Sequence, residues 1–135
     1  MRNELLRIID ANLNRLHEGL RVCEEIVRFI IEDERLTAEY KNLRHSILRN
    51  LNRNPKLRIA LLRSRDSLRD VGKELPNPTR HKVYKDVFSG NIQRVKESLR
   101  VIEEFSKIFD PFLSRAFSRT RFKTYELEKK TLERF

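Results

Sequence analysis

The sequence predicts an all-α protein: an up-and-down helical bundle made of two duplicated helical hairpins related by a pseudo-twofold axis. The 135 residues include only three glycines and four prolines, while charged residues make up 37% of the chain. Apolar residues recur at steps of three and four, which is the period of an amphipathic helix. The fourteen-residue line NLNRLHEGLRVCEE, beginning at Asn12, returns as NIQRVKESLRVIEE at Asn91 with eight identical positions. A second copy this similar indicates an internal duplication.

The first hairpin is expected over residues 3–52. Its first helix is expected over residues 3–32, with Asn3 as the N-cap. Its second helix is expected over residues 37–52, with Thr37 as the cap. Both segments carry one apolar face, so the two helices are expected to pack against each other.

A connecting region, residues 53–80, separates the two hairpins. Pro55 is expected to start a short third helix, because proline is tolerated at the first helical position. Residues 65–80 contain one glycine and two prolines and lose the helical period, so they predict a loop. A sixteen-residue loop is long for a compact domain, and such loops often form lids or binding sites.

The second hairpin is expected over about residues 81–135. It holds a fourth helix over about 81–109 and a fifth that begins near Pro111 and runs to the C-terminus. Together the two hairpins and their connection predict one domain, 1–135.

The net charge of +10 is compatible with a nucleic acid, a membrane surface or a phosphorylated metabolite as partner. No apolar run approaches the length that spans a membrane, and we expect no membrane contact. The single cysteine, Cys23, excludes an intrachain disulfide and favours a cytoplasmic protein. The most basic stretch, residues 115–123, is expected to be a solvated helix face, with Phe117, Phe122 and Tyr125 in the core.

The repeated line places a polar stripe beside the core of each copy. Each stripe carries an amide, a guanidinium and two carboxylates: Asn12, Arg15, Glu18 and Glu25, then Asn91, Arg94, Glu97 and Glu104. A glycine inside a helix is costly, and Gly19 aligns with the small Ser98, which predicts close approach by a helix or a ligand. The stripes are candidates for ligand binding; alternatively, they bond each other across the pseudo-twofold axis and hold the bundle together.

The loop motif RSRDSLRDVG adds a second group of candidates: Arg65, Asp66, Asp70 and Gly72. Alternating arginine and aspartate can hold phosphate oxygens and a magnesium ion together. Phosphoryl transfer needs positive charge, a metal and a carboxylate that receives or orients a hydroxyl proton. The chain lacks a GxxxxGK[ST] phosphate loop, a glycine-rich dinucleotide turn and a Cys/His cluster for zinc.

Four segments, in order, resemble one family: RIIDANLNRLHEGLRVCEEIVRFI, LRHSIL, RDSLRDVG and NIQRVKESLRVIEEFSKI. It is the helical hydroxymethylpyrimidine-phosphate kinase domain family, often fused N-terminally to bacterial thiamine-phosphate synthase. The resemblance implies conversion of 4-amino-5-hydroxymethyl-2-methylpyrimidine phosphate to the diphosphate in thiamine biosynthesis, with ATP and Mg²⁺. The chain ends at Phe135, which leaves no room for the synthase barrel, so it is expected to be free-standing or an excised domain.

With this resemblance in view, Asp66 and Asp70 are the expected catalytic and magnesium-binding residues. The expected substrate-binding residues are Asn12, Arg15, Glu18, Gly19, Glu25, Arg44, His45, Arg65, Gly72, Asn91, Arg94, Glu97 and Glu104. Two alternatives stay open: a non-catalytic module that binds a thiamine precursor or regulates the synthase, and, less favoured, a basic nucleic-acid-binding bundle. The expected partners are a phosphorylated pyrimidine and a thiamine-phosphate synthase, and a homodimer is compatible with the sequence.

Overall fold

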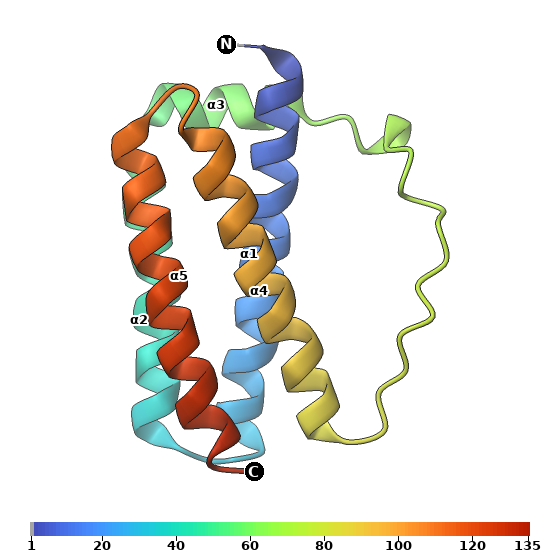
Figure 1. Ribbon diagram of the computed structural model, residues 1–135, viewed down its shortest axis with the longest axis vertical. Coiled ribbons are helices and arrows are strands. Elements are labelled where there is room, and N and C mark those ends of the chain that lie inside the picture. The colour runs from blue at the N-terminus through green and yellow to red at the C-terminus, as the bar shows by residue number, and fades with distance from the viewer. Residues whose placement is uncertain (1) are drawn as a thin grey trace.

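A computed structural model describes residues 2–135. This part of the chain contains helices and no strand, which confirms the all-α prediction (Figure 1). The elements are α1 (Asn3–Phe29), α2 (Glu34–Asn52), α3 (Pro55–Ser64), the 3₁₀ helix η1 (Ser67–Arg69), α4 (Tyr84–Ser106) and α5 (Pro111–Leu132).

The second helix of each hairpin begins at an aspartate cap. The Asp33 carboxylate accepts a hydrogen bond from the Leu36 backbone N at 2.9 Å, so α2 starts at Glu34 and the predicted cap at Thr37 is wrong. In α5 the Asp110 carboxylate accepts from the Leu113 N at 3.0 Å. Capping by a carboxylate satisfies an amide that the first turn leaves free. The two aspartates hold equivalent places in the two hairpins.

Three other predicted boundaries also shift. Asn3 is the first helical residue of α1 rather than its cap. Helix α1 ends at Phe29 instead of residue 32, and Glu32 turns the chain with a positive φ of 58°. Helix α4 begins at Tyr84 instead of residue 81, because the Asp86 carboxylate accepts hydrogen bonds from the backbone N of Lys82 and Val83 and fixes its first turn.

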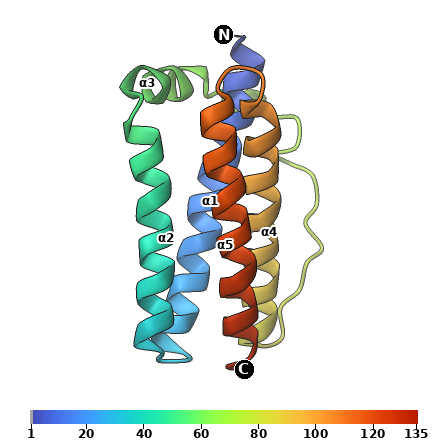
Figure 2. The same cartoon turned by 60° about the vertical axis from the view of Figure 1, so that its left-hand side comes forward.

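The four long helices form an up-and-down bundle in which α1 packs against α4 and α2 lies beside α5 (Figures 1 and 2). At the α1–α4 contact, a Cβ added to Gly19 would lie 2.9 Å from Val95 Cγ2 and 3.1 Å from the Asn91 carbonyl oxygen. Ser98, the repeat partner of Gly19, is buried on α4. The predicted packing of the two repeated helices against each other is therefore confirmed, with Gly19 at the contact.

Large apolar side chains fill the space between the four helices, with Tyr40, Phe88 and Phe117 among those fully buried. The Tyr40 hydroxyl is satisfied by the Thr131 hydroxyl at 2.8 Å, which joins α2 to α5. The expectation that Phe122 and Tyr125 lie in the core is wrong, since they are 60% and 38% exposed. These two rings stack edge to face on the surface of α5. Helix α3 crosses the end of the bundle where α1 begins (Figure 1).

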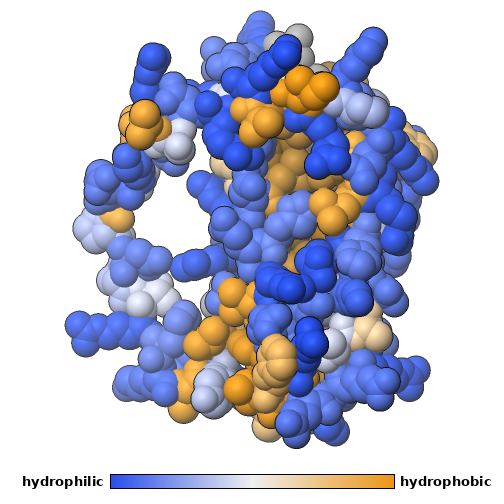
Figure 3. All heavy atoms as spheres, turned by 180° about the vertical axis from the view of Figure 1, so that it is seen from behind, coloured by the Kyte–Doolittle hydropathy of each residue, from blue (hydrophilic) through white to orange (hydrophobic). Residues whose placement is uncertain are grey.

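The connection from α3 to α4 runs as an arc. Between its two ends, this arc stands away from the bundle (Figures 1 and 3). Every residue from 67 to 85 is exposed. One end is tied to α1 through Arg65, whose guanidinium binds Asp10. The other end touches α4, where His81 Cε1 lies 3.0 Å from the place a Cβ on Gly90 would take. The loop prediction is confirmed, and the arc begins and ends against the two helices that carry the repeated line.

Candidate functional site

Each hairpin contains one buried carboxylate paired with an arginine of its second helix. Glu24 on α1 accepts from Arg44 Nε at 3.0 Å, and Glu103 on α4 accepts from Arg121 Nε at 2.8 Å. Both glutamates are almost fully buried, at 3% and 6% exposure. These pairs join α1 to α2 and α4 to α5, and they occupy equivalent positions of the repeat.

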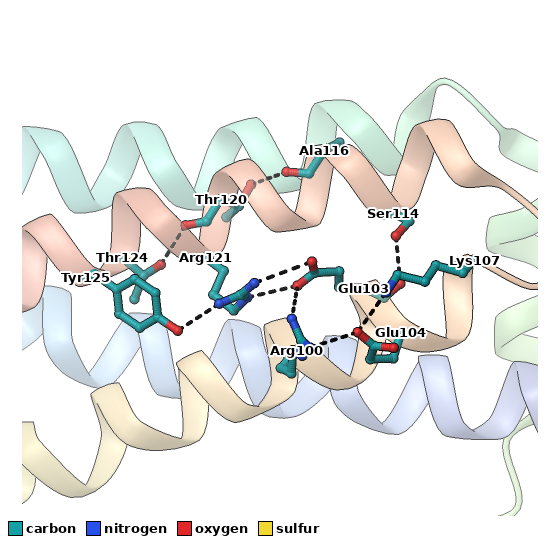
Figure 4. A network of polar contacts seen from close by, with 10 residues as sticks. All are labelled: Arg100, Glu103, Glu104, Lys107, Ser114, Ala116, Thr120, Arg121, Thr124 and Tyr125. Carbon is teal, nitrogen blue, oxygen red and sulfur yellow. Dashed lines mark hydrogen bonds and ion pairs between the residues drawn. The ribbon is translucent and has the colours of Figure 1, made fainter.

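The ion pairs set the charge state of the two glutamates. Burial raises the pKa of Glu24, but the hydrogen bonds and charge of Arg44 and Arg21 outweigh it and hold that pKa below its usual value. Burial also raises the pKa of Glu103, but the hydrogen bonds and charge of Arg121 outweigh it and hold that pKa below its usual value. Figure 4 shows Arg121 reaching from α5 to Glu103, with Arg100 on the other side of the carboxylate.

The remaining glutamates of the repeated line lie on the outer surface. Arg21 contacts Glu25 at 3.5 Å, and in the second copy Arg100 contacts Glu104 at 3.1 Å. Glu97 accepts a hydrogen bond from Gln93 of its own helix, and Glu18 is exposed. Pairs of this kind contribute little to stability, and they leave the carboxylates accessible to solvent.

A pocket of about 460 Å³, here called the loop pocket, lies between the first half of α1 and the start of the arc. It brings together five of the predicted site residues: Asn12, Arg15, Arg65, Asp66 and Asp70. They come from segments fifty or more residues apart, and the pocket exists because α3 returns the chain to α1. Its other lining residues are Glu4, Arg7, Ile8, Asp10, Ala11, Asn14 and Ser67.

One wall of the loop pocket is an ion pair that the sequence did not predict. Arg65 donates from Nε to Asp10 Oδ2 at 2.8 Å and from Nη2 to Asp10 Oδ1 at 2.9 Å, a bidentate geometry. The neighbouring carboxylate raises the pKa of Arg65. Asp10 is buried and has Ser89 as its repeat partner, so the duplication gave no sign of it. The clue in the sequence was that Asp10 is a charged residue beside the buried apolar residues Leu6, Ile9 and Leu13 of α1.

The paired asparagines of the stripes are satisfied within their own helices. Asn12 Nδ2 donates to the Ile8 carbonyl at 2.9 Å, and Asn91 Nδ2 donates to the Val87 carbonyl at 2.8 Å. The Asn12 Oδ1 accepts from Arg15 Nη1 at 3.4 Å. The alternative in which the stripes bond each other across the pseudo-twofold axis is therefore not what the structure has.

The two loop aspartates each keep carboxylate oxygens near the mouth of the loop pocket. Asp66 caps η1 by accepting from the Arg69 backbone N, and its other oxygen lies 3.3 Å from Arg69 Nε. Asp70 accepts from the Gly72 N at 2.9 Å. Residues 2–135 contain no group of three or more acidic, histidine or cysteine side chains placed to hold a metal. Magnesium commonly needs only one or two carboxylates when substrate phosphates supply further oxygens, and magnesium binding by Asp66 and Asp70 stays a prediction.

The other predicted site residues lie outside the loop pocket. Arg94 is exposed on α4 and does not line it, so a site shared by Arg15 and Arg94 stays a prediction. Arg44 is engaged by Glu24, and His45 is half-buried beside it on α2. The basic stretch 115–123 does not present one continuous cationic face, because Arg121 is turned into its ion pair with Glu103.

The chain matches the ThiD2 family over residues 7–130. It is 40% identical over 124 residues to a thiamine-phosphate synthase of Nostoc punctiforme, covering 90% of this chain and 34% of that protein. It is 42% identical over 127 residues to the thiamine-phosphate synthase of Thermosynechococcus vestitus, covering 93% and 34% of the two chains. The thiamine-phosphate synthase of Synechocystis sp. is 38% identical over 127 residues, covering 92% and 35%.

The chain thus spans about a third of the length of the curated relatives it matches. No solved structure matches it. Within residues 2–135 no helix has the length and apolar character needed to cross a membrane.

Proposed function

The chain belongs to the ThiD2 family, and from this premise we propose that it acts in thiamine biosynthesis as an ATP-dependent kinase. Its substrate would be 4-amino-5-hydroxymethyl-2-methylpyrimidine phosphate and its product the diphosphate, which thiamine-phosphate synthase consumes. The observation that carries the proposal is the loop pocket, where Arg15 of the repeated line lies with Asp66 and Asp70 of the loop.

The chemistry of this step assigns roles to the pocket residues. An oxygen of the pyrimidine monophosphate attacks the γ-phosphorus of ATP, the bond from that phosphorus to the bridging oxygen breaks, and ADP leaves. A phosphate monoester has a second pKa of about 6, so the attacking oxygen carries no proton near neutral pH. No general base is then required, and catalysis depends on positioning and on charge neutralisation.

Two arginines are suited to that neutralisation. Arg15 lines the loop pocket together with Arg7, whose Nη2 lies 3.5 Å from the Asp66 carbonyl oxygen. A guanidinium matches two phosphate oxygens at once, which suits it to the two phosphates that meet in this reaction. Arg65 is a positioning residue here, because its guanidinium is committed to Asp10 and fixes the start of the loop.

Asp66 and Asp70 would hold the magnesium ion, which would neutralise phosphate charge when bound. Their place at the start of an exposed arc lets the loop bring both carboxylates to substrate held on α1. The charge of the loop pocket is mixed, since Glu4 and Asp10 also line it. A bound cation would reduce the repulsion between these four acids and incoming phosphates.

The test is an assay of the purified chain with ATP, Mg²⁺ and the pyrimidine monophosphate. We expect ADP and the pyrimidine diphosphate to appear in equal amounts, measured by liquid chromatography with mass detection. The unphosphorylated hydroxymethylpyrimidine serves as the comparison substrate, because it lacks the attacking phosphate. Absence of diphosphate, with the monophosphate still bound in calorimetry, would refute the kinase and leave a binding module.

That second candidate, a non-catalytic module that regulates a synthase, is favoured by one observation. The chain corresponds to about a third of relatives that are all called thiamine-phosphate synthase. A module of this kind would bind the pyrimidine phosphate at Arg15 without consuming ATP. Calorimetry with the monophosphate, with and without ATP, separates the two, because only the kinase produces heat that continues until substrate is exhausted.

A further inference from the structure

A second pocket, of about 530 Å³, lies on the other side of the Asp10–Arg65 ion pair, between α1, α2 and α3. We call it the α3 pocket. It shares Asp10, Asn14 and Arg65 with the loop pocket, so the two hollows are separated only by these side chains. Seen from behind, hydrophobic surface is sunk between hydrophilic ridges at the end of the bundle where α3 lies (Figure 3).

The lining of the α3 pocket differs in character from that of the loop pocket. Leucines of α1, α2 and α3 form its floor, and Ile59 and Leu62 stand at its edge with 53% and 62% of their surface exposed. Arg58 also lines it. Ligand pockets commonly measure roughly 300–1,000 Å³ and are mainly apolar with a few polar groups. The α3 pocket is apolar enough to receive a flat ring, whereas the loop pocket is lined by opposite charges.

His17 marks this place as one where the two halves of the protein have diverged. Its repeat partner Lys96 forms an ion pair with Glu128 of α5 at 2.8 Å. In the first hairpin the position of Glu128 is taken by Leu51, and His17 Nε2 is buried with no hydrogen-bond partner among residues 2–135. Burial and the charge of Arg44 lower the pKa of His17, so the ring is neutral near pH 7. Buried polar atoms are normally partnered, so this nitrogen marks a place where the first hairpin has lost the polar contact that the second one keeps.

We propose that the α3 pocket receives the purine base of the phosphoryl donor, with the triphosphate passing over the Asp10–Arg65 ion pair into the loop pocket. This inference rests on the proposed kinase function. The base would lie against Leu48, Leu51 and the edge formed by Ile59 and Leu62. The γ-phosphate would then reach the pocket that holds Arg15 and the loop aspartates.

The arrangement explains why α3 and the arc occur only once in a duplicated chain. Helix α3 closes the outer side of the α3 pocket, and Arg65, directly after it, forms the partition. Donor and acceptor then approach the partition from opposite sides, which places the reacting phosphates in the loop pocket. In-line transfer requires such an opposed approach.

The test compares charge substitutions at the edge of the α3 pocket with one elsewhere. Ile59→Glu and Leu62→Glu each place a carboxylate where the nucleotide would lie, and both positions are exposed, so the fold should tolerate the change. Ile108→Glu is the matched control, since Ile108 is 70% exposed and does not line the pocket. Calorimetry with Mg²⁺ and the β,γ-imido analogue of ATP gives the dissociation constant.

We expect both pocket variants to weaken binding of the analogue roughly tenfold or more, because like charges are brought together, while the control keeps the wild-type value. The KM for ATP should rise together with the dissociation constant of the analogue, and the KM for the pyrimidine monophosphate should stay constant. Unchanged analogue binding in both variants would overturn the inference, and so would a rise confined to the KM for the pyrimidine.

Failure of the inference and failure of the proposed function are separable. If the wild-type chain forms the diphosphate but both variants keep its KM for ATP, the kinase stands and the assigned nucleotide site falls. If the wild-type chain binds the analogue in a way that Ile59→Glu abolishes, yet forms no diphosphate, the site stands and the kinase falls.

Discussion

The same substitution at two helix glycines, Gly19→Ala and Gly90→Ala, should have opposite effects on stability. Replacing glycine with alanine in a helix interior favours the helix by roughly 0.5–1 kcal/mol. At Gly19 the new methyl would meet Val95 Cγ2 at 2.9 Å and the Asn91 carbonyl oxygen at 3.1 Å. The carbonyl belongs to the α4 backbone, so the helices themselves must separate, and overpacking of this kind costs roughly 1–3 kcal/mol.

The two contributions at Gly19 leave a net loss of about 1 kcal/mol in the free energy of unfolding. At Gly90 the nearest atom is His81 Cε1 at 3.0 Å, the far end of an exposed side chain that can turn aside. Gly90→Ala should therefore keep most of the helix gain. For a chain of this size, 1 kcal/mol corresponds to a shift of about 3–5 °C in Tm.

Thermal unfolding followed by circular dichroism at 222 nm measures both variants, and urea titration checks that unfolding stays two-state. The expected result is a Tm below wild type for Gly19→Ala and at or above it for Gly90→Ala. A Tm for Gly19→Ala as high as that of Gly90→Ala would show that the helices do not meet as closely at residue 19 as the structure has them.

Three further predictions concern charge. Asp70→Asn should lower turnover roughly 100-fold by weakening magnesium binding, with partial recovery at high Mg²⁺. It should change stability by less than about 1 kcal/mol, because this exposed carboxylate accepts a hydrogen bond from the Gly72 amide of its own loop; a stable, fully active variant would contradict it. Replacing both Arg15 and Arg94 with Lys should raise the Kd for the pyrimidine monophosphate in calorimetry without lowering Tm, and an unchanged Kd would return both residues to a structural role. Because the folded-state pKa of Glu24 and Glu103 is depressed, their contribution to stability is complete above the ordinary value of 4.5 and is lost as the pH falls through the lowered values. When Tm is measured from pH 6 downward, it should start to decrease once the pH is below about 4.5. Glu103→Gln should make this decrease of Tm with pH smaller.

The fold was predictable because helix period and repetition act over long stretches of sequence. Gly19 could be assigned to a close contact from its cost inside a helix and from its small repeat partner, and the structure places it against α4. The start of α2 was not predictable in the same way. Asp33 and Thr37 are both capping residues, and the choice depends on the turn made by Glu32, which is closed by the backbone hydrogen bond from Asp33 N to the Val27 carbonyl.

The candidate site was predictable only in part, for a related reason. The loop motif and the α1 stripe each suggested phosphate chemistry, but nothing in the sequence said that the stripe of α1, rather than that of α4, would meet the loop. Asp10 makes that choice by binding Arg65. The pairing of Glu24 with Arg44 was not predictable either, because Arg44 lies on another helix and a contact between helices has no local signature.

The residues that occur in both halves of the molecule hold its helices together, whereas the two pockets lie beside segments that occur once. Equivalent residues in the two halves make equivalent bonds, as the pairs Glu24–Arg44 and Glu103–Arg121 show, and these bonds join helices within each hairpin. Both pockets lie instead where the halves differ, beside α3 and the start of the arc, which occur once in the chain. Arg15 and its repeat partner are the same residue with different surroundings, and only Arg15 lines the loop pocket. The repeated line therefore supplies the bundle, and the unrepeated segments decide which of its two arginines lines the loop pocket.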